Sequence, residues 1–121
     1  MKVLIIDDEP DVRSVARLSL GRVGGMDVIE LSGGADAVPT ATTERPDVIL
    51  LDVMMPEVDG VETFGALRAN SATASIPVVF ITAKAMAEDV QRLRSLGALD
   101  VIVKPFDPMT LADDLREILD R

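Results

Sequence analysis

Four short apolar runs of the sequence are each followed at once by polar side chains that would share one site. The runs and the residues after them are 2–6 before Asp7, Asp8 and Glu9, 47–51 before Asp52, 77–81 before Thr82, and 99–103 before Lys104. Two carboxylates about 4 Å apart repel by roughly 1 kcal/mol in water and ~4 kcal/mol at an effective dielectric constant of 20. One lysine offsets only part of this repulsion. A hard divalent cation would relieve it, and oxygen ligands without His or Cys suit Mg2+, which readily shares a phosphate group.

Each of these residues also has a purely structural interpretation. Asp7 and Asp8 are suitable caps for the helix that follows them, and Thr82 is a suitable cap for a later one. Asp52 and Lys104 are acceptable turn residues. Turn and cap chemistry does not require carboxylates, a hydroxyl and an ammonium group at successive strand ends, so the combination favours one shared site.

Composition excludes several kinds of chemistry. The 121 residues include no Cys and no His, which rules out disulfides, thiol catalysis, Ser-His-Asp hydrolysis and the usual zinc ligands. With 21 acidic and 12 basic side chains the formal net charge is -9, so we expect no direct binding to nucleic acid or to anionic membranes. The N-terminal apolar run is too short for a signal peptide or a membrane span, and a cytoplasmic location is expected.

The elements that would position the polar residues alternate regularly. The four apolar runs given above and a further run at 26–31 are rich in Val and Ile and are the predicted strands. Most of them are apolar at nearly every position, as in strands buried on both faces. Repeated strand–helix alternation implies parallel strands joined by right-handed crossovers, with a ligand site beyond their carboxyl ends. The length, and the lack of a repeat or linker, predict a single domain over 1–121.

Helices are expected between these strands. Starts are predicted at Pro10, at Asp59 with Glu62 as a capping box, and at Asp107-Pro108. Pro39 would cost an interior helix about 3 kcal/mol, so the helix over 34–44 is expected to be short or distorted. The predicted inward faces are Val12, Val15, Ala16 and Leu20, with an end near Gly21; Val61, Phe64 and Leu67; Met86, Val90 and Leu93, with an end at Gly97; and Leu111, Leu115, Ile118 and Leu119.

Taken together, the motifs resemble those of the response-regulator receiver family over essentially the whole chain. They are Asp7-Asp8-Glu9, Leu51-Asp52-Val53-Met54-Met55-Pro56 followed by Asp59-Gly60, Thr82-Ala83, and Gly97-Ala98 leading to Lys104-Pro105-Phe106. Any one motif is weak, whereas their order and spacing together are highly specific. The expected fold is α/β, a doubly wound five-stranded parallel sheet of order 2-1-3-4-5, flavodoxin-like, with five helices.

The resemblance implies a metal-dependent phosphoacceptor. Asp52 would accept a phosphoryl group in a Mg2+-dependent reaction. Asp8, Asp52 and the backbone carbonyl of Met54 would ligate Mg2+ directly, and Asp7 would act through water.

The resemblance also implies how the phosphoryl group is held and where it comes from. Thr82 would bind one phosphoryl oxygen through its hydroxyl, and Lys104 would pair with another. The Lys104-Pro105 bond would be cis, which X–Pro bonds permit. The donor would be a phosphohistidine on a sensor histidine kinase or a histidine phosphotransfer protein, because this chain has no histidine. The chain would catalyse only its own phosphorylation and dephosphorylation, and would not otherwise be an enzyme.

The switching residues depart from the family pattern. In the family, the residue equivalent to Thr82 shifts towards the phosphoryl group and an aromatic residue on the fifth strand turns inward. The aligned residue here is Val101, whose short side chain, stiff at its first torsion, cannot copy a ring rotation. Backbone movement near Thr82 is still expected to change the surface formed by 84–96, 99–103 and 109–120, which would bind an output partner. Met54 and Lys84 would flank the path of the hydrolytic water, where they would either modulate the phosphoryl lifetime or be exposed side chains without strong effect.

Three other classes of protein fit less well. Haloacid-dehalogenase-like phosphatases place two acids two residues apart after the first strand, whereas here the acids are adjacent and Asp52 follows the third strand. An interaction module that had lost the chemistry would have no need of all five polar residues. A flavodoxin-like cofactor binder would need a Ser/Thr/Gly-rich phosphate loop where this chain has three acids.

Overall fold

The computed structural model describes residues 1–84 and 86–121, in which strands and helices alternate. The strands are β1 (Lys2–Ile6), β2 (Asp27–Leu31), β3 (Val48–Asp52), β4 (Val78–Thr82) and β5 (Asp100–Val103). The helices are α1 (Pro10–Arg17), α2 (Ala37–Glu44), α3 (Gly60–Ala69), α4 (Ala87–Ser95) and α5 (Leu111–Leu119). A π-helical segment η1 (Leu18–Val23) continues α1, and a short 3-10 helix η2 (Gly34–Asp36) precedes α2.

The five strands form one parallel sheet in the order β2-β1-β3-β4-β5. The predicted strand order is therefore confirmed. The winding direction changes between β1 and β3, which are neighbours in the sheet, and this is the place where such sheets bind ligands beyond their carboxyl ends.

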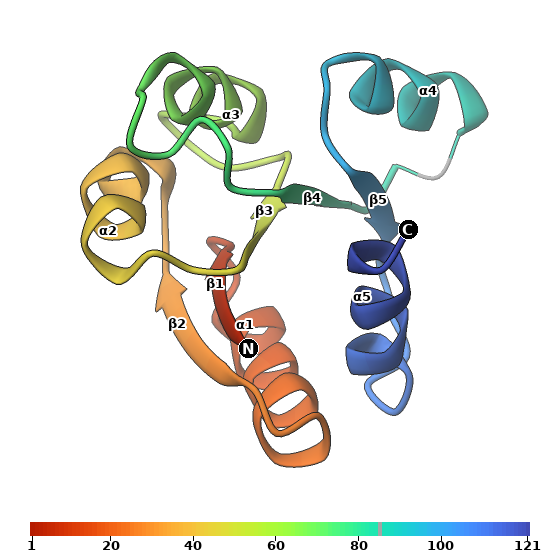
Figure 1. Cartoon of the computed structure of the whole chain (residues 1–121). Helices are drawn as coiled ribbons and strands as arrows, with labels where there is room; N and C mark the ends of the chain where they lie inside the picture. Colours follow the sequence, from red (N-terminus) through yellow and green to blue (C-terminus); the bar gives the residue numbers. More distant parts are fainter. Residues whose placement is uncertain (85) are drawn as a thin grey trace.

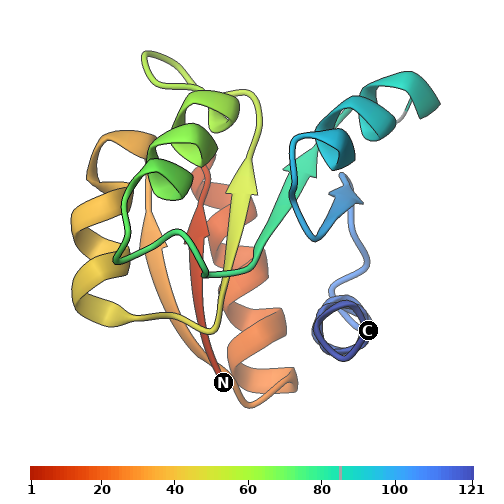
Figure 2. The ribbon, with the colours of Figure 1, turned by 45° about the horizontal axis from the view of Figure 1, so that its top comes forward.

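Two helical layers cover the sheet, α1 and α5 on one face and α2, α3 and α4 on the other (Figures 1 and 2). Alternate residues of a strand point to opposite faces, so each strand contributes to both cores. Val3 and Ile5 of β1 pack towards α1 and α5, whereas Leu4 and Ile6 pack towards the other layer. Burial on both faces explains why the central strands are apolar at nearly every position.

Two strands extend one residue further than predicted, and those residues belong to the expected site. Asp52 pairs with Ile81 in the sheet, and Thr82 pairs with Val103. Four of the five strands also begin one residue later than predicted. Asp52 and Thr82 are thus the last residues of buried strands, which fixes their backbones more firmly than a loop would.

The second helix is short, as expected. It has eight residues, follows the 3-10 helix η2, and carries Pro39 in its first turn. The N–H groups of a first turn have no partner within the helix, so proline is tolerated there. Asp59 caps α3 as predicted, because its side chain accepts a hydrogen bond from the Glu62 backbone N–H at 2.8 Å.

Three helix predictions are wrong in detail. Val15 is 38% exposed, because α1 and η1 bury a narrow stripe around Ala16 and Leu20. Met86 is 62% exposed, because it is the extended residue before α4 and does not lie on its inner face. The last helix begins at Leu111, because the Asp107 carboxylate accepts from Met109 N–H at 2.8 Å and stabilises a turn first.

Every helix within residues 1–84 and 86–121 is too short or too polar to cross a lipid bilayer.

Candidate functional site

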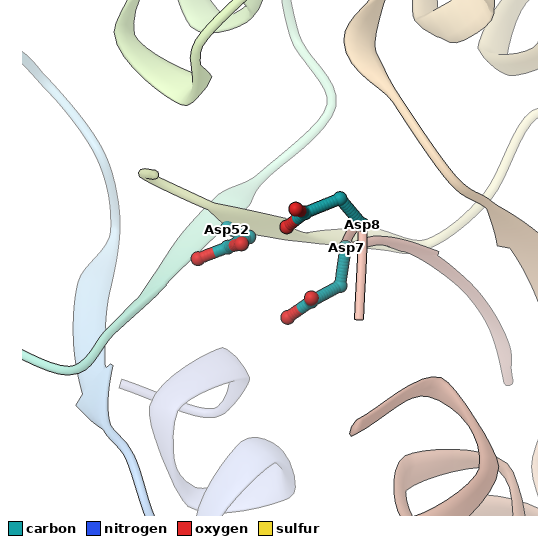
Figure 3. A group of neighbouring side chains, drawn as sticks. All are labelled: Asp7, Asp8 and Asp52. Carbon is teal, nitrogen blue, oxygen red and sulfur yellow. The ribbon is translucent and has the colours of Figure 1, made fainter. Parts of the chain in front are cut away.

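Three carboxylates meet at the carboxyl edge of the sheet (Figure 3). Asp7 and Asp8 follow β1, and Asp52 ends the neighbouring strand β3. One oxygen from each carboxylate lies within 4.8 Å of the other two. The prediction that these side chains come together is confirmed, and we call Asp7, Asp8 and Asp52 the acidic cluster.

Hydrogen bonds hold Asp7 firmly within the acidic cluster. Its backbone N–H donates to Leu31 O at 3.1 Å, which extends the pairing of β1 with β2. Its Oδ1 accepts from the Glu9 backbone N–H at 2.9 Å, as in an Asx turn. Glu9, and not Asp7 or Asp8, is the N-cap residue of α1, so the capping interpretation does not account for Asp8.

Lys104 contributes the positive charge of the site. It follows β5, its bond to Pro105 is cis as predicted, and its backbone N–H donates to Thr82 O at 2.8 Å. Its Nζ lies 2.8 Å from Asp7 Oδ2, 3.3 Å from Asp52 Oδ1 and 3.6 Å from Glu9 Oε1. The Lys104 side chain is only 12% exposed and Asp7 and Asp52 are buried, so water screens these two ion pairs weakly, whereas Glu9 is 62% exposed.

The electrostatics of the site are dominated by crowded negative charge. Burial, followed by the neighbouring charge of Asp7, raises the pKa of Asp52 from its ordinary value of 3.8 to about 7, and Lys104 offsets only part of this. Burial acts to lower the pKa of Lys104, but its hydrogen bond to Asp7 and the charges of Asp52 and Asp7 raise it overall. Lys104 therefore stays an ammonium ion while Asp52 titrates near neutrality.

The acidic cluster fits a hard cation. Asp8 Oδ1 and Asp52 Oδ2 are buried, and neither accepts a hydrogen bond from the residues described in the structure. A buried carboxylate oxygen without a donor is costly, and a cation would satisfy it. All the candidate ligand atoms are oxygens, which suits Mg2+ better than a transition metal.

Within the described part of the chain, no hydrogen bond or ion pair links the side chains of Thr82, Met54 and Lys84 to the acidic cluster. Thr82 is buried, and its hydroxyl oxygen accepts from the Lys84 backbone N–H at 3.0 Å. Thr82 does not cap α4, whose N-cap residue is Met86. Met54 follows β3 with a side chain 61% exposed, and the side chain of Lys84 is also exposed.

Val101 lies on the edge strand β5, opposite Phe80 of β4. It is half-buried and packs against the core cluster beneath α2, α3 and α4. The position expected to carry an aromatic switch is therefore filled by a small side chain that is already packed.

Two residues near the cluster were given no role from the sequence. Glu9 brings a third carboxylate to Lys104, after those of Asp7 and Asp52. Arg13 donates from Nη1 to the backbone oxygen of Asp7 at 2.6 Å. The position of Arg13, one helical turn after Glu9, could have predicted this bond from the sequence. Side chains in a helix lean towards its N-terminus, so Arg13 is expected to reach back towards the end of β1.

Gly60 keeps the loop after β3 close to Asp52. Its N–H donates to Val53 O at 2.9 Å, and a Cβ on Gly60 would overlap the backbone oxygen of Asp52 and lie 2.8 Å from Val53 Cα. We expect Gly60→Ala to lower the free energy of unfolding by about 2–3 kcal/mol, because the backbone atoms cannot move aside cheaply. Urea unfolding followed by circular dichroism measures this.

The matched control for Gly60→Ala is Gly65→Ala in the same helix. A Cβ on Gly65 meets nothing within 4 Å, so alanine there should stabilise the protein by roughly 0.5–1 kcal/mol through helix propensity. Equal effects of the two substitutions would contradict the close packing of Gly60 on Asp52.

The raised pKa of Asp52 predicts a pH-dependent stability of the metal-free protein. The folded carboxyl titrates at about 7 and the unfolded one near 3.8, so the folded chain binds more protons between these values. The contribution of Asp52 to the free energy of unfolding should therefore be greatest below about pH 4, fall as the pH rises to about 7, and level off above. The total decrease between these pH values should be on the order of 2–4 kcal/mol. Asp52→Asn should be the more stable protein above neutral pH, and the difference should vanish in acid. Urea unfolding of both proteins across pH checks this, and parallel stability curves would contradict it.

A family model and curated relatives match the chain. The model of the response regulator receiver domain matches residues 3–116. The chain is 38% identical over 120 residues to the alkaline phosphatase synthesis transcriptional regulatory protein PhoP of Bacillus subtilis, covering 99% of this chain and 49% of that protein. It is 35% identical over 120 residues to the DNA-binding dual master transcriptional regulator RpaA of Synechocystis, again covering 99% and 49%. The chain thus spans about half the length of the curated relatives it matches.

Solved structures agree with these relatives. The chemotaxis response regulator CheY4 of Vibrio cholerae matches with a TM-score of 0.87 and 33% identity, covering 97% of both chains. A response regulator from Desulfuromonas acetoxidans matches with a TM-score of 0.89 and 28% identity, covering 98% of this chain and 96% of that one. The sheet order, the acidic cluster and these matches lead to one conclusion: the chain belongs to the response regulator receiver domain family of two-component systems.

Proposed function

We propose that this receiver is controlled by phosphorylation of Asp52 at a Mg2+ site. The observation that carries the proposal is the burial of the Asp52 carboxylate between two other carboxylates and one ammonium group. Receiver domains generally bind Mg2+ at such a cluster, and the residues here fit it. Asp8, Asp52 and the carbonyl oxygen of Met54 would hold the ion, with Asp7 bound through water.

Phosphoryl transfer to Asp52 forms one bond and breaks another. A carboxylate oxygen of Asp52 attacks the phosphorus, the phosphorus–nitrogen bond to the donor histidine breaks, and its electron pair returns to the imidazole. Bound Mg2+ would supply charge neutralisation between the anionic nucleophile and the anionic phosphoryl group. Lys104, whose Nζ lies 3.3 Å from Asp52 Oδ1, would pair with a phosphoryl oxygen once Asp52 is phosphorylated, and the Thr82 hydroxyl would bind another.

The donor would be a phosphohistidine on a sensor histidine kinase or a histidine phosphotransfer protein. Receivers of response regulators are phosphorylated by histidine kinases, and this chain has no histidine of its own. Water would later hydrolyse the aspartyl phosphate and reset the domain. In this proposal the chain catalyses only its own phosphorylation and dephosphorylation, and Met54 and Lys84 are the candidates for setting their rate.

A movement of Thr82 would transmit the effect of phosphorylation from Asp52 to the protein surface. The Thr82 hydroxyl oxygen now accepts from Lys84 N–H, so a shift of Thr82 towards a phosphoryl oxygen would pull on the backbone that leads to α4. This route needs no rotating aromatic ring and is compatible with Val101. The surface of 84–96, 99–103 and 109–120, of which residue 85 lies outside the described residues, exposes Leu96, Leu99 and Val103.

We propose that this surface binds an output partner or output domain. The curated relatives PhoP and RpaA are named as transcriptional regulators and are about twice the length of this chain. The receiver itself, with a net charge of -9, is not expected to contact nucleic acid directly.

Mg2+ should stabilise the folded protein. At ten times its dissociation constant, the ion should add about 1.4 kcal/mol, or roughly 3–6 °C in melting temperature for a domain of this size. Thermal melts with and without millimolar MgCl2 measure the shift. Asp8→Asn removes one proposed ligand and should reduce it strongly. A wild-type melting curve that Mg2+ leaves in place would argue against the site.

A further inference from the structure

We propose that Arg13 is a positioning residue of the acidic cluster and increases its affinity for Mg2+. This inference rests on the proposed function and extends it to a residue of α1. In the structure of residues 1–84 and 86–121, Arg13 forms no hydrogen bond to Thr82 or Lys104, the residues proposed to bind the phosphoryl group. The carrying observation is the hydrogen bond from Arg13 Nη1 to the backbone oxygen of Asp7 at 2.6 Å. The Arg13 side chain is only 18% exposed, so this bond lies largely out of water.

The bond completes the fixation of Asp7. The N–H of Asp7 donates to Leu31 O and its Oδ1 accepts from Glu9 N–H, which leaves the backbone oxygen to Arg13 and Oδ2 to Lys104. Among the described residues, Arg13 is the one hydrogen-bond donor to that backbone oxygen. Three hydrogen-bonding positions of Asp7 are thus in use, and its Oδ2 is ion-paired with Lys104.

The same peptide group also orients Asp8. The carbonyl that Arg13 holds belongs to the peptide bond between Asp7 and Asp8, and a peptide bond is planar and rigid. Rotation of this group would move both carboxylates relative to Asp52. Arg13 therefore fixes the separation of the proposed metal ligands without contacting a carboxylate of the cluster.

Arg13 is itself held from a third element. Its Nε lies 3.7 Å from Glu30 Oε1 on β2, and Glu30 Oε2 accepts from Arg17 Nη1 at 2.6 Å. Arg17 is 62% exposed, and its guanidinium group donates to Glu30 and not to Asp7. Arg13 and Arg17 are thus two guanidinium groups of equal charge on α1, both ion-paired with Glu30, and of the two only Arg13 donates a hydrogen bond to Asp7.

Two physical effects of Arg13 oppose each other, which makes the proposal testable. Its positive charge repels a cation, so a role through charge alone means that removal of Arg13 tightens Mg2+ binding. Its hydrogen bond preorganises the ligands, so a positioning role means that removal weakens binding. Outer hydrogen-bond partners of metal sites typically change affinity by 10–100-fold, and we expect an effect near the lower end, about tenfold.

The experiment is a Mg2+ titration of the apoprotein followed by NMR amide shifts. Arg13→Met should raise the Kd for Mg2+ by about tenfold. Arg13→Lys, which keeps the charge and one donor, should recover part of the loss. Arg17→Met is the matched control and should stay within about twofold of the wild type. Without Mg2+, hydrogen exchange of the Asp7 amide should accelerate in Arg13→Met and not in Arg17→Met.

The outcomes separate this inference from the proposed function. If the wild type binds Mg2+ and Arg13→Met binds it equally or more tightly, the positioning role is overturned and the function stands. If Arg17→Met weakens Mg2+ binding as much as Arg13→Met does, the positioning role is also overturned, because the loss would then come from the ion pairs with Glu30 and not from the bond to Asp7. If the wild type binds no Mg2+, the proposed function and this inference fall together. Should Arg13→Met not fold, Arg13→Gln decides instead: weaker binding supports the proposal and unchanged or tighter binding overturns it.

Discussion

Asp52→Asn should abolish the incorporation of a phosphoryl group from acetyl phosphate, with a decrease of more than about 100-fold. An amide oxygen is a far weaker nucleophile than a carboxylate, and the product would not be a stable acyl phosphate. The substitution preserves shape and removes a charge from a crowded site, so the variant should fold at least as well as the wild type. Incorporation is measured by intact-protein mass spectrometry with MgCl2 present.

Asp47→Asn is the matched control for this loss. Asp47 precedes the same strand, β3, at the opposite edge of the sheet, where its carboxylate accepts from Lys2 N–H at 2.7 Å. Incorporation should remain near the wild-type level in this variant. Undiminished labelling of Asp52→Asn would show that another residue is the acceptor.

Lys104→Met should slow phosphorylation by about 100-fold while Mg2+ still binds. The Lys104 ammonium group is 3.3 Å from Asp52 Oδ1 and 2.8 Å from Asp7 Oδ2, so it offsets negative charge where a phosphoryl group would add more. Its removal leaves the acidic cluster more negative, and Mg2+ affinity should stay the same or increase. The rate of acetyl phosphate labelling and an NMR titration with Mg2+ test the two parts separately.

The control for Lys104→Met is Lys2→Met. Lys2 begins β1 at the far edge of the sheet, and its Nζ donates to Glu44 O at 3.1 Å, so the variant loses the same charge away from the site. Labelling by this variant should match the wild type. A parallel loss of Mg2+ binding and labelling in Lys104→Met would indicate that Lys104 supports the site structurally and not through the phosphoryl group.

Much of the fold follows from sequence patterns because the strands are buried on both faces. Runs such as 2–6 and 47–51 have no polar alternation, which is the pattern of a parallel sheet covered by helices. The position of the acids then follows from topology, since parallel strands end at the same edge. Asp7 and Asp52, 45 residues apart in the sequence, come together for this reason.

Other features depend on tertiary packing and are not visible in local patterns. Met86 fits a helical stripe by spacing, yet it precedes α4 and points into solvent. The π-helical continuation of α1 has no local sequence signal that we recognise. Arg13 has a suitable spacing for reaching back to the strand end, but its ion pair with Glu30 arises only when β2 packs beside β1. The pKa of Asp52 likewise depends on burial and on Asp7, which only the assembled site determines.

A crystal structure of the chain with Mg2+ and beryllofluoride tests the central claim most directly. We predict beryllofluoride bonded to a carboxylate oxygen of Asp52, with Mg2+ in contact with Asp8 and Asp52, and with Thr82 and Lys104 bound to fluorine atoms. An adduct on a different residue, or Asp52 free of both ligands while the protein is saturated with them, would contradict the account.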